Sequence, residues 1–121
     1  MLHHQAAPPT APLPLDLIYQ ALADPGRRFM VERLTRGPAS VTHLAEPLPM
    51  SLSAVVQHLK VLEDAGLITS QKVGRVRTCQ VAPAALRTAE QWIADRRTFW
   101  EQQYDQLEAY LNDTNDQEKP Q

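Results

Sequence analysis

The side chains best suited to molecular recognition in this 121-residue chain lie between Ser51 and Lys60. A serine hydroxyl, the amide of Gln57 and the imidazole of His58 can donate and accept hydrogen bonds, as reading base edges in a DNA major groove requires. Gln57 is the best candidate for direct base reading, because its amide can pair bidentately with adenine. We expect six residues of this segment to contact DNA: Ser51, Ser53, Ala54, Gln57, His58 and Lys60.

Two other interpretations of these residues stay open. The polar side chains could form the solvated surface of an ordinary helix. His58 could instead be satisfied by a neighbouring backbone group, although its place beside Gln57 favours proximity to DNA.

A helix is the element that must present this surface. Apolar residues recur at spacings of three and four, which places them on one helix face; they are Leu52, Val55, Val56, Leu59 and Leu62. Ser51 or Ser53 can cap the first turn with its side-chain oxygen. Gly66 follows the last periodic residue, where a left-handed position beyond a helix favours glycine.

A short β-hairpin is predicted directly after this helix. Residues 67–81 hold two runs rich in β-branched residues that flank Gly74-Arg75, a pattern typical of a tight turn. Lys72, Arg75 and Arg77 cluster near the tip, where cations suit contact with phosphates or the minor groove. We expect Arg75 and Arg77 to anchor the hairpin on DNA. A merely soluble, charged tip is the weaker alternative, since no acidic residue accompanies them.

The upstream segment has the order of a helix-turn-helix. Asp24-Pro25 is a strong helix start, with a capping residue followed by proline at the first helical position. Arg27 and Arg28 in the first turn are candidate phosphate clamps, or else solvated arginines. Ser40 can cap a further short helix that prolines close before the reading helix begins, the order of a helix, a turn and a reading helix.

Three segments, ALADPGRRFMVERL, SVTHLAEPLPMSLSAVVQHLKVLEDAGLI and VGRVRTCQV, resemble the ArsR/SmtB family of bacterial winged-helix repressors. The resemblance covers roughly residues 15–111, and HLKVLEDAGLI is its most specific part. It is closest to a branch that lacks metal-ligand cysteines and has a GRVRT-type wing. It implies a homodimeric repressor of an imperfect palindrome, often in its own promoter. Val56 stands where many relatives have serine, so one hydroxyl-to-phosphate contact is absent here.

The C-terminal segment predicts a dimer contact. Pro83 can open a helix to about Asn112, and its wide aromatic stripe exceeds what one small core absorbs, so a partner helix is expected. Packing within a monomer is the alternative. A dimer would present two reading helices to successive major grooves of a pseudo-palindromic site. The expected interface residues of the first and last helices are Leu15, Ile18, Leu22, Leu86, Trp92, Ile93, Trp100, Leu107 and Leu111.

Residue types argue against metal or dithiol sensing. The resemblance matches the paired cysteines of metal-binding relatives to Ser40 and Thr42, neither of them a soft ligand. The last helix contains no histidine, and Cys79 is the single cysteine. We therefore expect no metal and no cofactor. Cys79 is interpreted as a buried strand residue acting as a small hydrophobe; an intermolecular disulfide or a modified thiol is the alternative.

A small hydrophobic effector of unknown identity near Trp92, Phe99 and Trp100 is a further hypothesis. Aromatic stripes at helical spacing are more often core than pocket, so it stands behind the dimer interpretation.

Charge supports contact with nucleic acid through one part of the chain. Residues 26–77 hold eight Lys/Arg against four acids, or +4, and residues 84–121 hold four against eight, or −4. Asp16 and Asp24 complete the formal net charge of −2. A basic middle and an acidic end predict that one face meets phosphate and the other does not.

The predicted fold class is mainly α with a small β-hairpin, a winged helix-turn-helix with a long C-terminal dimerisation helix. Residues 15–111 form the domain, 1–14 a proline-rich flexible arm and 112–121 a disordered tail. No apolar run is long enough to span a membrane. A single cysteine fits a reducing cytoplasm, and no set of catalytic residues indicates an enzyme. The prediction is a dimeric transcriptional repressor that binds double-stranded DNA; a winged-helix protein-interaction module is the alternative.

Overall fold

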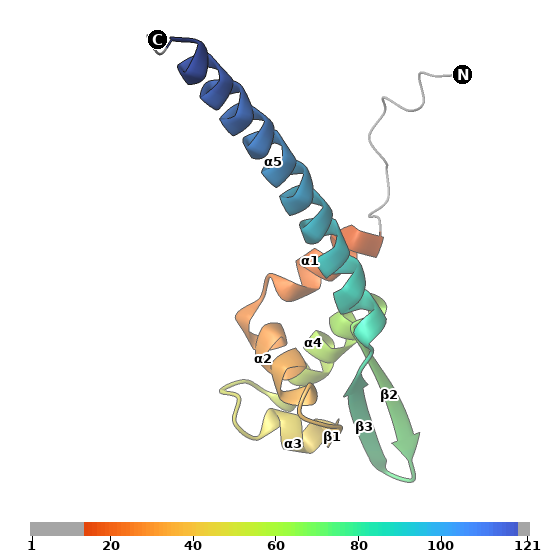
Figure 1. Ribbon diagram of the computed structural model, residues 1–121. Coiled ribbons are helices and arrows are strands. Elements are labelled where there is room, and N and C mark those ends of the chain that lie inside the picture. Colours follow the sequence, from red (N-terminus) through yellow and green to blue (C-terminus); the bar gives the residue numbers. More distant parts are fainter. Residues whose placement is uncertain (1–13, 119–121) are drawn as a thin grey trace, which may run out of the picture. The chain divides into compact units, whose positions relative to one another are not determined.

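The computed structural model describes residues 14–118, shown in colour in Figure 1. The chain divides into a unit that ends at Ala89 and a second unit that starts at Glu90. The arm predicted at residues 1–14 lies outside the described residues except for Pro14, which opens the first helix.

Helices dominate the described residues, and one small antiparallel sheet accompanies them, which confirms the predicted fold class. In chain order the elements are α1 (Pro14–Leu22), α2 (Pro25–Leu34), β1 (Ala39–Ser40), α3 (Val41–Ala45), α4 (Leu52–Asp64), β2 (Ile68–Val73), β3 (Val76–Val81) and α5 (Pro83–Glu118).

Both ends of α4 are fixed by local hydrogen bonds. At its start the Ser51 hydroxyl accepts from the amide of Ala54 at 3.2 Å, so Ser51 rather than Ser53 is the cap. At its end Gly66 adopts a left-handed φ of 75°. The amide of Gly66 donates to the Glu63 carbonyl at 2.9 Å and that of Leu67 to the Leu62 carbonyl at 3.0 Å. This paired closure satisfies carbonyls that the helix leaves free and fixes where the chain turns into β2.

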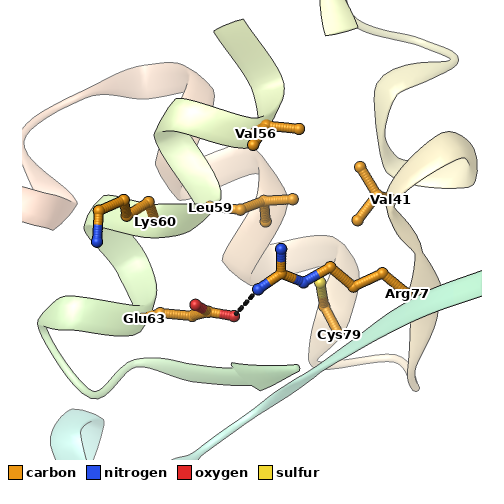
Figure 2. Close-up of a pocket in the computed structure, with 7 residues that line it drawn as sticks. All are labelled: Val41, Val56, Leu59, Lys60, Glu63, Arg77 and Cys79. Atoms are coloured by element: carbon orange, nitrogen blue, oxygen red, sulfur yellow. Dashed lines mark hydrogen bonds and ion pairs between the residues drawn. The ribbon is translucent and has the colours of Figure 1, made fainter. Parts of the chain in front are cut away.

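The buried part of α4 is narrower than its apolar face. Val55, Leu59 and Leu62 are buried, but Leu52 is 56% exposed and Val56 is 43% exposed. Leu52 is the first helical residue, and Val56 lines a hollow shared with α3 and β3 (Figure 2). The five residues keep the predicted spacing along one side of α4, and three of them are buried.

The predicted hairpin is confirmed, with Val73 opposite Val76 and a two-residue turn between them. Gly74 in that turn has a left-handed φ of 63°, which glycine adopts without a steric penalty. The sequence did not predict β1, which pairs with β3 and sets Ala39 opposite Cys79. A strand of two residues is too short to show the alternation of apolar and polar residues that predicts strands, so the sequence contains no signal for β1.

The core of the first unit draws on every helix and strand that ends before Ala89. All of its buried side chains among the described residues are apolar; the largest include Met30, Leu44, Leu62 and Leu67. Cys79 is 1% exposed at the centre of the sheet, which agrees with its interpretation as a small buried hydrophobe.

Helix α5 starts at Pro83 as predicted and continues to Glu118. The predicted end near Asn112 was six residues too early. Residues 112–118 of the predicted tail are therefore helical, and 119–121 lie outside the described residues. Within the part of the chain that the structure describes, no helix combines the length and apolar character needed to cross a membrane.

The closure of α4 generates the first testable prediction. Replacing Gly66 by Ala places a Cβ on a left-handed residue, so we expect the free energy of unfolding to fall by about 1 kcal/mol. Gly66→Asn is the matched control, because Asn tolerates this backbone conformation better. Urea titration of both variants measures the difference. Equal stability of the wild-type and Ala proteins would contradict the role given to this glycine.

Candidate nucleic-acid interface

The exposed side of α4 carries three polar residues at spacings of three and four: Ser53, Gln57 and Lys60. Residues three and four apart are neighbours on a helix surface, so these side chains form one stripe. Within residues 14–118, no hydrogen bond occupies the Gln57 amide. A free, exposed amide in the middle of a helix surface is suited to reading a base edge.

Three side chains in or beside this stripe already have partners within the protein. The Ser51 hydroxyl caps α4 through the amide of Ala54 and lies 3.3 Å from that of Ser53. Lys60 pairs with Asp64, with 3.5 Å between Nζ and Oδ2, and both side chains are largely exposed. An exposed pair of this kind contributes little stability, so the ammonium of Lys60 can exchange its partner for a phosphate.

His58 lies on the flank of α4, half-buried, and its Nδ1 is 3.2 Å from Nη1 of Arg27. The guanidinium has only donors, so the imidazole Nδ1 is the acceptor in this contact. The structure thus gives His58 a protein partner on α2 and does not place it in the exposed stripe. The partner is a side chain, whereas the alternative weighed from the sequence was a backbone group.

Arg27 and Arg28 both reach back to the end of α1. Arg27 donates from Nε to the Ala21 carbonyl at 2.7 Å and from Nη2 to the Gln20 carbonyl at 3.0 Å. Arg28 donates from Nη1 to the Leu22 carbonyl at 2.8 Å. Cations that satisfy the last carbonyls of a helix also complement its dipole.

The two candidate clamps are therefore engaged within the protein. The signal that could have revealed this is the spacing: α1 and α2 are separated by two residues, so first-turn arginines can reach the preceding helix end.

The three cations of the hairpin are placed differently. Lys72 and Arg75 are exposed, and no hydrogen bond or ion pair within residues 14–118 engages either one. Arg77 is engaged: its Nε donates to the Ser70 hydroxyl at 3.1 Å, and its Nη2 lies 3.5 Å from Oε1 of Glu63 (Figure 2). Of the two arginines expected to anchor the hairpin, Arg75 alone has a free guanidinium in the part of the chain that the structure describes.

A hollow of about 160 Å³ lies beside Arg77, lined by Val41, Val56, Leu59, Lys60, Glu63, Arg77 and Cys79 (Figure 2). Burial, with a further contribution from the Glu63 carboxylate, raises the pKa of the Cys79 thiol above its ordinary value. Nucleophilic cysteines need the thiolate, so the surroundings of Cys79 do not favour a reactive thiol.

The residues matched to metal-binding cysteines have other surroundings. The Ser40 hydroxyl accepts from the amide of His43 at 3.1 Å and caps α3, and Thr42 is exposed on that helix. Among residues 14–118, no three His, Cys, Asp or Glu side chains lie close enough together to hold a metal ion.

The expected dimer residues fall into two groups. In the first unit, Ile18 is 3% exposed in the core, and Leu22 and Leu86 pack against that core, while Leu15 is half-buried. Ile18 has almost no area left to bury against a partner, so its expected interface role does not fit the structure. In the second unit all five remaining residues are between 44% and 64% exposed; they are Trp92, Ile93, Trp100, Leu107 and Leu111.

Two aromatic contacts in the second unit join residues of α5. Arg96 lies over the ring of Trp92 at 5.1 Å, and Trp100 stacks on Tyr104 with 5.6 Å between ring centroids. Phe99 is 62% exposed. Because these rings are open to solvent in one chain, an effector site beside them would need a second surface to enclose it.

Comparison with known proteins identifies relatives of this arrangement. Residues 22–71 match the helix-turn-helix domain family. The HTH-type transcriptional regulator Rv2034 of Mycobacterium tuberculosis is 48% identical over 88 residues, which cover 70% of this chain and 77% of that protein.

Solved structures agree with this match. An ArsR family transcriptional regulator, RHA00566, superposes with a TM-score of 0.70 at 45% identity, over 73% of this chain and 91% of its own. The fold also matches a domain from Mycobacterium bovis described as a homodimeric winged helix-turn-helix DNA-binding domain. That match has a TM-score of 0.57 at 24% identity, over 70% of this chain and 82% of that one.

The cap of α2 beside this surface generates a prediction of pH dependence. The pKa of Asp24 is lowered from its ordinary value of 3.8, chiefly because its carboxylate accepts from the amide of Arg27 at 3.0 Å. A lowered pKa means that this stabilisation is present above the unfolded-state pKa and is lost as pH falls through the folded-state pKa.

We expect Asp24→Asn, which caps without titrating, to make the fall in stability between about pH 5 and about pH 2.5 shallower than in the wild type. Thermal unfolding across this pH range provides the measurement. Asp113→Asn, an exposed change on α5, is the control and should leave the profile unchanged. Parallel profiles for the wild type and Asp24→Asn would refute the assignment.

Proposed function

Since this chain belongs to the ArsR family of helix-turn-helix transcriptional regulators, we propose that it is a dimeric repressor of a pseudo-palindromic operator. Its own promoter is the first region to test. The two α4 helices of the dimer read successive major grooves, and repression follows from occlusion of the promoter. The cytoplasm is the proposed compartment, and no enzymatic step is part of the proposal.

One observation carries this proposal: α4 presents an exposed polar stripe while the adjacent hairpin presents unengaged cations. Ser53 and Gln57 offer hydrogen-bonding groups, and Lys72 and Arg75 offer charge without a protein partner in the described residues. Base contacts specify the sequence and phosphate contacts fix the register, so the two sets together meet both needs of an operator-binding surface. The formal charge of +4 over residues 26–77 adds attraction to DNA.

Dimerisation is supported by the second unit. Its large apolar side chains are between 44% and 67% exposed along α5 from Trp92 to Leu111. Monomeric soluble proteins rarely leave so much contiguous apolar surface in water. The Mycobacterium bovis domain described as homodimeric shares the fold. We therefore infer that a second copy of the chain covers this face.

The reading role of α4 can be tested at Gln57. We expect Gln57→Ala to weaken binding at one base position in each half-site, by about 1–3 kcal/mol for a bidentate pair, and to leave affinity for duplexes altered at that position unchanged. Titrations against the upstream promoter and a set of single-base variants measure this. Arg75→Ala is the comparison: it should weaken all sequences alike and reduce the salt dependence. If both variants bind like the wild type, the reading face is misassigned.

The dimer contact can be tested at Trp100 and Leu107, which are 64% and 55% exposed and outside the core of the first unit. We expect Trp100→Ala with Leu107→Ala to cost about 2 kcal/mol or more of association, because large side chains dominate such interfaces. Analytical ultracentrifugation should show a shift to monomer, and operator affinity should fall with it. Arg97→Ala, on the same helix, is the control. An unchanged dimer would exclude this face as the contact.

A further inference from the structure

The cations of the hairpin, hereafter the wing (residues 68–81), divide into free and engaged side chains. In the described residues Lys72 and Arg75 have no ion-pair partner, whereas Arg77 joins a three-residue bridge with Glu63 and Ser70. The Ser70 hydroxyl donates to Oε1 of Glu63, the same atom that faces Nη2 of Arg77. The bridge therefore ties three elements, α4, β2 and β3, at one point.

We propose that Arg77 is a positioning residue, which sets the place of the wing against α4 through Glu63 and Ser70, and that wing contacts with phosphate belong to Arg75 and Lys72. The proposal rests on the proposed function, because it divides roles within the same DNA-binding surface. It differs from the expectation that Arg77 contacts DNA directly.

The hollow beside the bridge explains why a polar tie matters at this point. Val56 and Leu59 of α4 and Cys79 of β3 line a space of about 160 Å³, so side chains do not fill the gap between helix and strand. Figure 2 shows the Arg77 side chain extending beside this space to Glu63. Where packing leaves a gap, few van der Waals contacts oppose movement of the strand. The bridge then supplies a tie between the wing and α4 at a point where packing is incomplete.

Charge gives a second reason to keep Arg77 on Glu63. If its guanidinium left for a DNA phosphate, the Glu63 carboxylate, 28% exposed in its side chain, would lose its cation close to a polyanion. Like charges at short range repel. The free energy gained by the contact between Arg77 and phosphate would therefore be offset by repulsion between the Glu63 carboxylate and DNA. Arg75, at the turn, faces no such competition, because no acidic group in the described residues holds it.

The size of the effect follows from partial exposure. The side chain of Arg77 is 52% exposed, and partly exposed pairs contribute modestly to stability. We expect disruption of the bridge to weaken operator binding about two- to fivefold for each protomer. The distinguishing quantity is the salt dependence, because removing one cation from a phosphate reduces the slope of log K against log salt by about 0.9.

The experiment compares Arg77→Gln, Glu63→Gln and their double variant with Arg75→Gln, the matched control on the same wing. Arg75→Gln should reduce the salt slope by about 0.9 per protomer. Arg77→Gln should weaken binding with the slope unchanged, and the double variant should be no weaker than Arg77→Gln. Glu63→Gln releases the guanidinium from its carboxylate, so the slope should not fall in that variant. Arg77→Lys keeps the charge but not the planar fork, so it should weaken binding as well.

A second measurement needs no DNA. Backbone hydrogen exchange of residues 69–80 in the free dimer should accelerate in Arg77→Gln and Glu63→Gln and stay at the wild-type rate in Arg75→Gln. Three results would overturn the proposal: a slope reduced in Arg77→Gln as in Arg75→Gln, wild-type binding by Arg77→Lys, or unchanged exchange in both bridge variants. If the wild-type protein bound no duplex, the proposed function would be wrong. The hydrogen-exchange measurement would still test whether the bridge positions the wing.

Discussion

The burial of one face of α4 is the constraint on which the proposed DNA-binding surface depends. Val55, Leu59 and Leu62 are at most 5% exposed, and this packing fixes the rotation of the helix about its axis. With that rotation set, the 3.6-residue period places Ser53, Gln57 and Lys60 outside. The Ser51 cap and the Gly66 closure then fix where the helix begins and ends. The proposed reading surface of α4 is therefore a consequence of how the core packs.

Arginine bridges hold α4 on both flanks of the buried face. On one flank Arg27 joins His58 to the carbonyls that end α1, and on the other Arg77 joins Glu63 to the wing. Several basic residues therefore hold neighbouring elements of the protein in place, and their guanidinium groups are already engaged. The formal charge of +4 over residues 26–77 overstates the number of cations free for phosphate.

The sequence predicted most of the local structure because helix caps, apolar periods and turn glycines act over a few residues. Asp24 and Ser40 cap as predicted, and Ser51 is the one of the two candidate serines that caps α4. The hairpin turn falls at Gly74-Arg75. The features that the sequence did not predict depend on partners that are distant along the chain. The strand β1 exists through pairing with β3, and the partners of Arg27, His58 and Arg77 lie on other elements. The exposure of Val56 could not be predicted for the same reason. A helical period places Val56 on the apolar side of α4 but does not show whether a neighbouring element covers it.

The second unit poses a separate physical requirement. A helix gains most of its stability from burying an apolar face, yet from Trp92 to Leu111 the large apolar side chains of α5 remain about half exposed or more. Local contacts such as the stacking of Trp100 on Tyr104 cover little of that surface. In the proposed dimer, the order of this part of α5 and its association with a second copy are coupled, because the proposed contact also stabilises the helix. Under this proposal, protein concentration controls the fraction of dimer and, through it, the affinity for the proposed two-fold symmetric site.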